Sequence, residues 1–189
     1  MNRGYFQKFQ IKDVVFLAIM SAVALATCAV MPLVISLQPL IFGISQLVTA
    51  LQISVFFAIG LYKVRKPGSL LLMALMMGLI QLMMSPPMFL SSVLNGVLIE
   101  LIVLLLFRGY ERDTAVFVAA MLHTPLSLPF NYLYNRLIKG ADSPLAAVAD
   151  RAPLAAVGMT LAVVAVSALG ALIGIKIARE LKKSGVLKK

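Results

Sequence analysis

The chain contains no tryptophan, a single cysteine and only seven acidic residues among its 189. One cysteine excludes an internal disulfide and a cysteine-based metal site. The sequence also lacks a Walker motif, an HExxH pattern and a GxSxG pattern. Neither ATP hydrolysis nor a familiar hydrolase mechanism can therefore be assigned. We expect a protein that is not an enzyme and that carries no cofactor and no bound metal.

Charge of either sign is scarce, since 13% of the residues are charged and 61% are hydrophobic. Soluble domains average roughly 25% charged and 45–50% apolar residues. The mean hydropathy of +1.00 points the same way. We infer that the bilayer is the solvent. The net charge of +10 comes from short basic clusters between charge-free runs, which is a sign of membrane topology and not of a nucleic-acid partner.

Charge-free runs divide the chain into membrane spans. Residues 14–62 hold 49 residues without a charge, more than twice the roughly 20 that one crossing needs, so a break is expected between Pro32 and Gly43. Residues 67–107 carry one charge, and Ser85-Pro86-Pro87 divides them. The sequence predicts an all-α integral membrane protein without a cleaved signal peptide, a single membrane domain over residues 1–189. Its six transmembrane helices are expected at about 13–31, 43–62, 69–84, 88–107, 113–136 and 153–178.

The basic residues predict the orientation of these six helices. With both termini in the cytoplasm, 14 of the 17 lysines and arginines face inward, and only Arg136, Lys139 and Arg151 face outward. Cytoplasmic loops carry such an excess of lysine and arginine. We therefore expect a multi-pass protein of the cytoplasmic membrane with both termini cytoplasmic.

Glu100 is the one carboxylate inside an apolar segment. Such a group costs about 2.5–3.5 kcal/mol on insertion scales, so it normally faces protein, water or a ligand. It could belong to a binding pocket, form a structural hydrogen bond, or pair with His123, which is expected at a similar depth. His123 itself could equally be a neutral interhelical hydrogen-bonding group.

Polar residues on the fifth expected span predict one wall of a binding site. His123, Ser127, Asn131 and Asn135 recur at every fourth position and so share one helical face. Pro125 and Pro129 lie in the same segment, and each frees a carbonyl that a neighbour, water or substrate must satisfy. Tyr132 and Tyr134 could stack on a ligand or belong to an interfacial aromatic belt.

Further polar residues extend this wall into a neutral cavity that opens to the outside. Gln46, Thr49 and Gln52 share one face of the second span, and Gln81 and Asn95 lie in the outer halves of the third and fourth. Several converging amides favour a small-molecule site. The methionines around residues 73–88 favour adaptable packing over metal binding. The residues expected to bind substrate are Glu100, Asn95, His123, Ser127, Asn131, Asn135, Tyr132, Gln81 and Gln46.

Two ridges of small residues allow another helix to approach closely. Ala18, Ala22 and Ala26 form overlapping AxxxA units on the first span, and Gly170 and Gly174 form GxxxG on the sixth. Either ridge could pack within the protein. The alanine ridge could instead be a docking surface for a partner.

The combination of these features resembles the S component of energy-coupling factor transporters, the membrane subunit that binds the substrate. The resemblance rests on six short helices, the AxxxA units, the basic segment YKVRKPG at residues 62–68, NGVLIE at residues 95–100 and the basic C-terminal tail. Residues 62–112 are most similar to the branch that handles thiamine or its hydroxymethylpyrimidine precursor, and to related uncharacterised S components. S components, however, often stack their ligand on tryptophan, so stacking here would fall to Phe89, Phe130, Tyr132 or Tyr134.

The resemblance implies an uptake subunit for a vitamin-like small molecule, without enzymatic activity. Its partners would be a transmembrane coupling subunit, docked on Ala18, Ala22 and Ala26, and two cytoplasmic ATPases that supply the energy. The alternative from the residues alone is an autonomous proton-coupled carrier that uses Glu100. A membrane enzyme or scaffold is the least favoured class, since no second catalytic group accompanies Glu100.

Overall fold

The computed structural model describes residues 8–28, 33–34, 36–138, 140 and 143–185. Within these ranges the chain is all-helical, with seven defined α-helices and no β-strand. The helices are α1 (Ile11–Thr27), α3 (Ile44–Lys63), α4 (Ser69–Leu82), α5 (Pro86–Phe107), α6 (Asp113–Leu137), α7 (Pro144–Arg151) and α8 (Pro153–Lys183).

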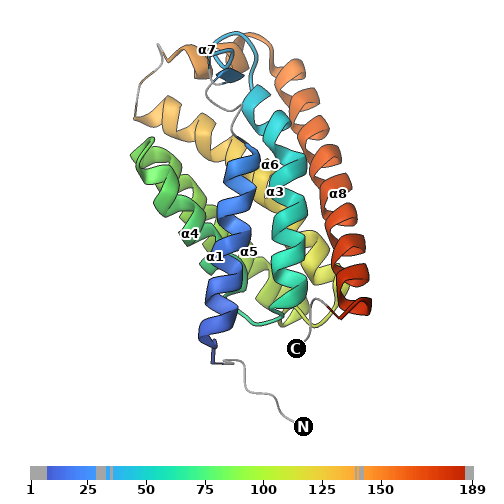
Figure 1. Ribbon diagram of the computed structural model, residues 1–189. Coiled ribbons are helices and arrows are strands. Elements are labelled where there is room, and N and C mark those ends of the chain that lie inside the picture. Colours follow the sequence, from blue (N-terminus) through green and yellow to red (C-terminus); the bar gives the residue numbers. More distant parts are fainter. Residues whose placement is uncertain (1–7, 29–32, 35, 139, 141–142, 186–189) are drawn as a thin grey trace.

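The long helices form one bundle in which α3 is central, because it packs against α1, α6 and α8 (Figure 1). The helix α4 packs against α5 and α1, and α5 also packs against α6. The start of α1 and the end of α8 lie at the same end of the bundle, whereas α7 lies at the opposite end (Figure 1). The six crossings expected from the sequence would place the two ends on one side in this way.

Four helices are long and apolar enough to cross a bilayer, namely α3, α5, α6 and α8. They lie at the expected spans 43–62, 88–107, 113–136 and 153–178. The helices α1 and α4 lie at the other two expected spans, but with 17 and 14 residues they are shorter than one straight crossing. Residues 29–31 of the first expected span lie outside the described residues. The chain is therefore an integral membrane protein with several apolar helices, and six crossings stay a prediction.

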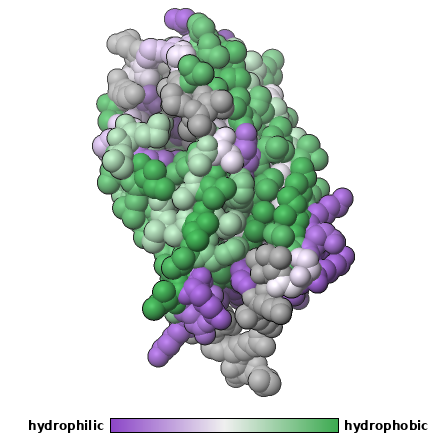
Figure 2. Space-filling model, viewed as in Figure 1, coloured by the Kyte–Doolittle hydropathy of each residue, from purple (hydrophilic) through white to green (hydrophobic). Residues whose placement is uncertain are grey.

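On the face that Figure 2 shows, exposed apolar side chains cover the middle of the bundle as a belt, and hydrophilic residues gather toward its ends. Leu105 is 81% exposed and Leu161 is 64% exposed, although both lie within long apolar helices. Contiguous apolar surface of this kind marks contact with another apolar phase. Lipid is the phase that suits exposed apolar surface on helices long enough to cross a bilayer.

The GxxxG ridge packs inside the protein, against α3. A Cβ added at Gly170 would lie 2.6 Å from the carbonyl oxygen of Leu51, and one added at Gly174 would lie 2.5 Å from that of Val55. Only glycine permits so close an approach of two helix backbones. The GxxxG ridge therefore serves packing within the protein, at a contact with α3 that we call the seam between α3 and α8.

The alanine ridge of α1 behaves differently. Ala22 and Ala26 are exposed and Ala18 is half-buried, whereas Leu17 and Ala24 on the other face of α1 are fully buried. The alanine face is thus left uncovered by the rest of the described chain. This arrangement leaves it free to contact lipid or a partner.

Ion pairs join several helices at the end of the bundle where α1 begins and α8 ends. We call this the basic end. Asp113, the first residue of α6, accepts hydrogen bonds from Arg65 and from Arg179 of α8. Lys66 donates to Asp13 of α1 with an Nζ to Oδ2 distance of 2.6 Å. The connection between α3 and α4 is therefore tied to α1, α6 and α8.

Candidate functional site

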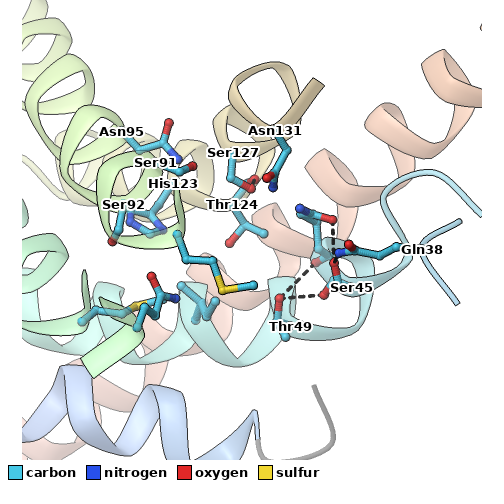
Figure 3. A pocket seen from close by; sticks show the side chains of 15 residues that line it. Gln38, Ser45, Thr49, Ser91, Ser92, Asn95, His123, Thr124, Ser127 and Asn131 are labelled. Carbon is cyan, nitrogen blue, oxygen red and sulfur yellow. Dashed lines mark hydrogen bonds between the residues drawn. The ribbon is translucent and has the colours of Figure 1, made fainter. Parts of the chain in front are cut away.

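A polar cavity of about 100 Å³ lies between α3, α4, α5 and α6. It is lined by Gln38, Ser45, Gln46, Thr49, Ile53, Met77, Gln81, Met88, Ser91, Ser92, Asn95, His123, Thr124, Ser127 and Asn131. Ten of these residues are labelled in Figure 3, where Asn95, Ser91 and His123 lie on one side and Gln38, Ser45 and Thr49 on the other. The sequence thus predicted a cavity that the structure contains.

The cavity lies in the half of the bundle away from the basic end. Its lining residues come from the first part of α3 and α5 and from the last part of α4 and α6. These helices alternate in direction, and all four of those parts lie toward the end that carries α7 (Figure 1). This is the side that the sequence predicts to face outward.

One side of the cavity is held in shape by hydrogen bonds among its own residues. Ser45 donates to the Oε1 atom of Gln46 at 2.9 Å and accepts a hydrogen bond from Gln38. Thr49 donates to the carbonyl oxygen of Ser45 at 2.8 Å. These side chains are held in place before any ligand arrives, which lowers the entropic cost of binding.

The opposite side of the cavity contains buried polar atoms that have no hydrogen-bond partner within the described structure. They are Asn95 Oδ1, both ring nitrogens of His123 and Thr124 Oγ1. The three side chains are at most 4% exposed, and all three line the cavity. A buried polar atom without a partner costs about 1–3 kcal/mol, so such atoms normally bind water or a ligand.

The ring of His123 packs against Phe57 of α3, with ring centroids 4.5 Å apart and an interplanar angle of 54°. This contact holds the ring, and both ring nitrogens remain without a hydrogen-bond partner in the described structure. A neutral imidazole offers one donor and one acceptor. With Asn95 and Thr124 beside it, the site can therefore hold a group that both donates and accepts hydrogen bonds.

None of the described lining residues is charged. A cavity of this kind suits a neutral ligand, because an ion would lose its hydration without gaining a counter-charge. Of the methionines around residues 73–88, Met77 and Met88 line the cavity. Within the part of the chain that the structure describes, no group of three histidine, cysteine or acidic side chains could hold a metal ion.

The polar face of α6 reaches the cavity only in part. His123, Ser127 and Asn131 line it, whereas Asn135 bonds with Ser143, which donates to its Oδ1 atom at 3.0 Å. The helix α6 continues through Pro125 and Pro129 as one α-helix. The polar face therefore serves two purposes: it forms the cavity wall and it anchors the segment before α7.

Glu100 lies outside this cavity and has a partner set of its own. Its carboxylate accepts hydrogen bonds from the backbone N–H groups of Gly68 at 2.6 Å and Leu71 at 3.4 Å, and from the Tyr110 hydroxyl at 2.9 Å. The first N–H groups of a helix have no partner within that helix. Glu100 therefore caps the start of α4. Of the three alternatives, the structure supports the structural hydrogen bond, since neither ring nitrogen of His123 has a hydrogen-bond partner within the described residues.

The expected aromatic residues are divided among several places. Tyr132 donates to Asp150 of α7 at 2.7 Å, on the exposed surface. Phe130 and Tyr134 line a separate groove, and Phe89 lies against Gly78. None of these four rings lines the polar cavity, so stacking inside it would fall to His123.

The sequence reasoning missed several lining residues, including Gln38, Ser45, Ser91, Ser92 and Thr124. Ser91 and Ser92 precede Asn95 by four and three positions, so helical spacing alone placed them beside it. Ser45 precedes Thr49 by four positions on the same helix, so the same spacing placed it there. Gln38 carries no such signal, because it precedes the helix and reaches the cavity through a turn.

Comparison with known proteins gives one match. A family model described as a hypothetical bacterial integral membrane protein (Trep_Strep) matches residues 11–183, which is most of the chain. No curated protein and no solved structure matches.

Proposed function

The chain belongs to the Trep_Strep family of hypothetical bacterial integral membrane proteins, and we propose that it is the substrate-binding S component of an energy-coupling factor importer. In this proposal the polar cavity captures a small molecule from outside the cell. A transmembrane coupling subunit and two cytoplasmic ATPases then drive its release into the cytoplasm. The six-helix topology with cytoplasmic termini belongs to the same proposal.

The observation that carries the proposal is the group of unpartnered atoms on Asn95, His123 and Thr124. Two helices, α5 and α6, would not bring four such atoms to one cavity for packing alone, since each atom lowers the stability of the protein when it lacks a partner. A ligand with donors and acceptors would satisfy them. The match between this cavity and the expected binding residues supports a binding protein.

The absence of charged side chains among the described lining residues narrows the choice of candidate substrates. Thiamine carries a positively charged thiazolium ring, and none of the described lining residues could balance that charge. Its hydroxymethylpyrimidine precursor is neutral and combines ring nitrogens with an amino group. Of the two candidates from the resemblance, the cavity favours the pyrimidine precursor.

The exposed alanine face supports docking of the coupling subunit on α1. Ala18, Ala22 and Ala26 leave space for a second helix backbone, and the neighbouring Ile19 is 50% exposed. Small residues flanked by apolar ones form close helix contacts in membranes. The GxxxG ridge is not available for this contact, because α3 covers it.

Ala22→Leu is expected to weaken assembly with the coupling subunit at least about tenfold, because a leucine side chain holds the partner helix away from α1. Co-purification of the tagged chain with a coupling subunit and ATPases measures the effect. Ala165→Leu is the control, since Ala165 is also exposed but lies on α8. Equal recovery of partners with Ala22→Leu and with the unchanged chain would contradict docking on this ridge.

The second candidate, an autonomous proton-coupled carrier, depends on Glu100. The three hydrogen bonds of Glu100 and its position outside the cavity favour a structural role, so the importer subunit is the better supported reading. Reconstitution in liposomes separates the two. The proposal predicts uptake of the pyrimidine precursor only with coupling subunit, ATPases and ATP. Uptake by the chain alone, driven by a pH gradient, would contradict it.

A further inference from the structure

A second cavity, of about 180 Å³, lies between α5 and α6 and is mostly apolar. We call it the lateral groove. It is lined by Pro87, Leu90, Ser91, Leu94, Phe130, Asn131, Leu133, Tyr134, Leu137 and Ile138. Leu90 and Leu133 are about half exposed, at 50% and 48%, so the groove opens sideways through the apolar belt.

The lateral groove adjoins the polar cavity, because Ser91 of α5 and Asn131 of α6 line both. These two helices pack against each other, and the shared residues lie at the boundary between the two spaces, which we call the junction. The junction is polar, while the groove beyond it is apolar. One molecule that passes through the junction would meet hydrogen-bonding groups first and apolar side chains next.

The volumes of the two spaces also favour one ligand that occupies both. Sites for small molecules usually have about 300–1,000 Å³. The polar cavity provides about 100 Å³, which accommodates a single polar group, and the groove provides a further 180 Å³. Each space alone is small for a vitamin-sized ligand, whereas together they approach the usual range.

We propose that the preferred substrate is larger than the pyrimidine precursor: a neutral amphipath whose polar head, with the donor and acceptor of an amide or an aminopyrimidine, binds at Asn95, His123 and Thr124, and whose apolar part, which the precursor lacks, lies in the lateral groove. This inference rests on the proposed function and narrows its substrate class. The unpartnered acceptor on Asn95 and the donor and acceptor of a neutral His123 complement an N–H donor and a carbonyl on the ligand. The apolar part gains by leaving water for the groove.

Two primary amides test this proposal in nanodiscs of phosphatidylcholine. Acetamide presents the head alone, and hexanamide adds four methylene groups. Each buried methylene tightens the Kd about fourfold, so we expect hexanamide to bind at least about tenfold tighter than acetamide, relative to the free concentration in water. Ligand-dependent shifts of the unfolding temperature give both Kd values.

Leu94→Trp fills the lateral groove and is expected to reduce this advantage of hexanamide to less than about twofold. Leu98→Trp is the matched control, because Leu98 lies one turn further along α5, is 40% exposed where Leu94 is 39% exposed, and lines neither cavity. The control is expected to keep the full advantage.

Three results would overturn the proposal, and they differ in what else they affect. If the advantage of hexanamide survives Leu94→Trp, its chain binds outside the groove. If hexanamide gains nothing while Asn95→Leu still weakens acetamide binding, lipid acyl chains hold the groove and the binding function stands. If neither amide binds, or Asn95→Leu changes nothing, the polar cavity is not the ligand site and the proposed function fails as well.

Discussion

Gly174→Leu is expected to lower the free energy of unfolding by about 3 kcal/mol or more, which is a large part of the stability of a typical protein. A Cβ at this position would lie 2.5 Å from the Val55 carbonyl oxygen and 2.7 Å from the Ala58 Cβ atom. Both neighbours belong to α3, so the two helices must separate. Overpacking costs typically 1–3 kcal/mol where side chains can adjust, and backbone atoms adjust less.

Gly158→Leu is the matched control for Gly174→Leu. Gly158 lies on the same helix, is exposed, and has no atom within 4 Å of an added Cβ. Leucine also favours helix over glycine by up to about 1 kcal/mol, so this variant should be as stable as the unchanged chain or slightly more so. Denaturant titration in detergent measures both variants. Equal stability of the two would show that α3 and α8 do not meet at this seam.

Glu100→Leu is expected to destabilise the protein by about 3 kcal/mol or more. The change leaves the N–H groups of Gly68 and Leu71 and the hydroxyl of Tyr110 without their acceptor, and each unsatisfied buried group costs about 1–3 kcal/mol. Glu100→Gln keeps one oxygen and should lose less. The same titration ranks the unchanged chain, Glu100→Gln and Glu100→Leu in that order.

Ligand binding separates this structural role of Glu100 from a role in transport. Glu100→Gln should retain substrate affinity in whatever fraction folds, because Glu100 does not line the polar cavity. Tyr110→Phe, which removes one of the three donors, should lose less stability than Glu100→Leu. If Glu100→Gln is fully stable and yet loses substrate binding, the capping role is wrong and a site role is right.

The wall formed by α6 was predictable from spacing, but its length was not. An α-helix turns by about 100° per residue, so each step of four residues drifts by about 40° around the axis. Three such steps from His123 to Asn135 amount to about 120°. This drift takes Asn135 off the cavity face and toward Ser143. The prediction that all four polar residues line one wall of the site is therefore wrong for Asn135.

The role of Glu100 could not be read from the sequence, because its partners are 32 and 10 positions away at Gly68 and Tyr110. One signal was present. The helix that starts at Ser69 follows Pro67-Gly68, which offers no side-chain cap, so its first N–H groups need an acceptor from elsewhere. In the structure, Glu100 is the group that meets this need.

The two ridges of small residues show a similar limit of prediction from sequence. GxxxG and AxxxA both predict close helix contacts, but neither pattern says whether the contact lies within the chain. The structure places Gly170 and Gly174 against α3 and leaves Ala22 and Ala26 exposed. Only the arrangement of the whole bundle decides which ridge stays free.

The central claim is that the polar cavity binds a small molecule through its unpartnered groups, and mass spectrometry of ligand retained by the purified protein tests it most directly. We expect a neutral small molecule in the unchanged chain and at least about tenfold less of it in Asn95→Leu, which keeps the side-chain size but removes the hydrogen bonds. Ser167→Ala is the control, since Ser167 is buried and unpartnered but lies outside the cavity, and it should retain the ligand fully. Equal occupancy in the unchanged chain and in Asn95→Leu, or no retained molecule in either, would contradict the account.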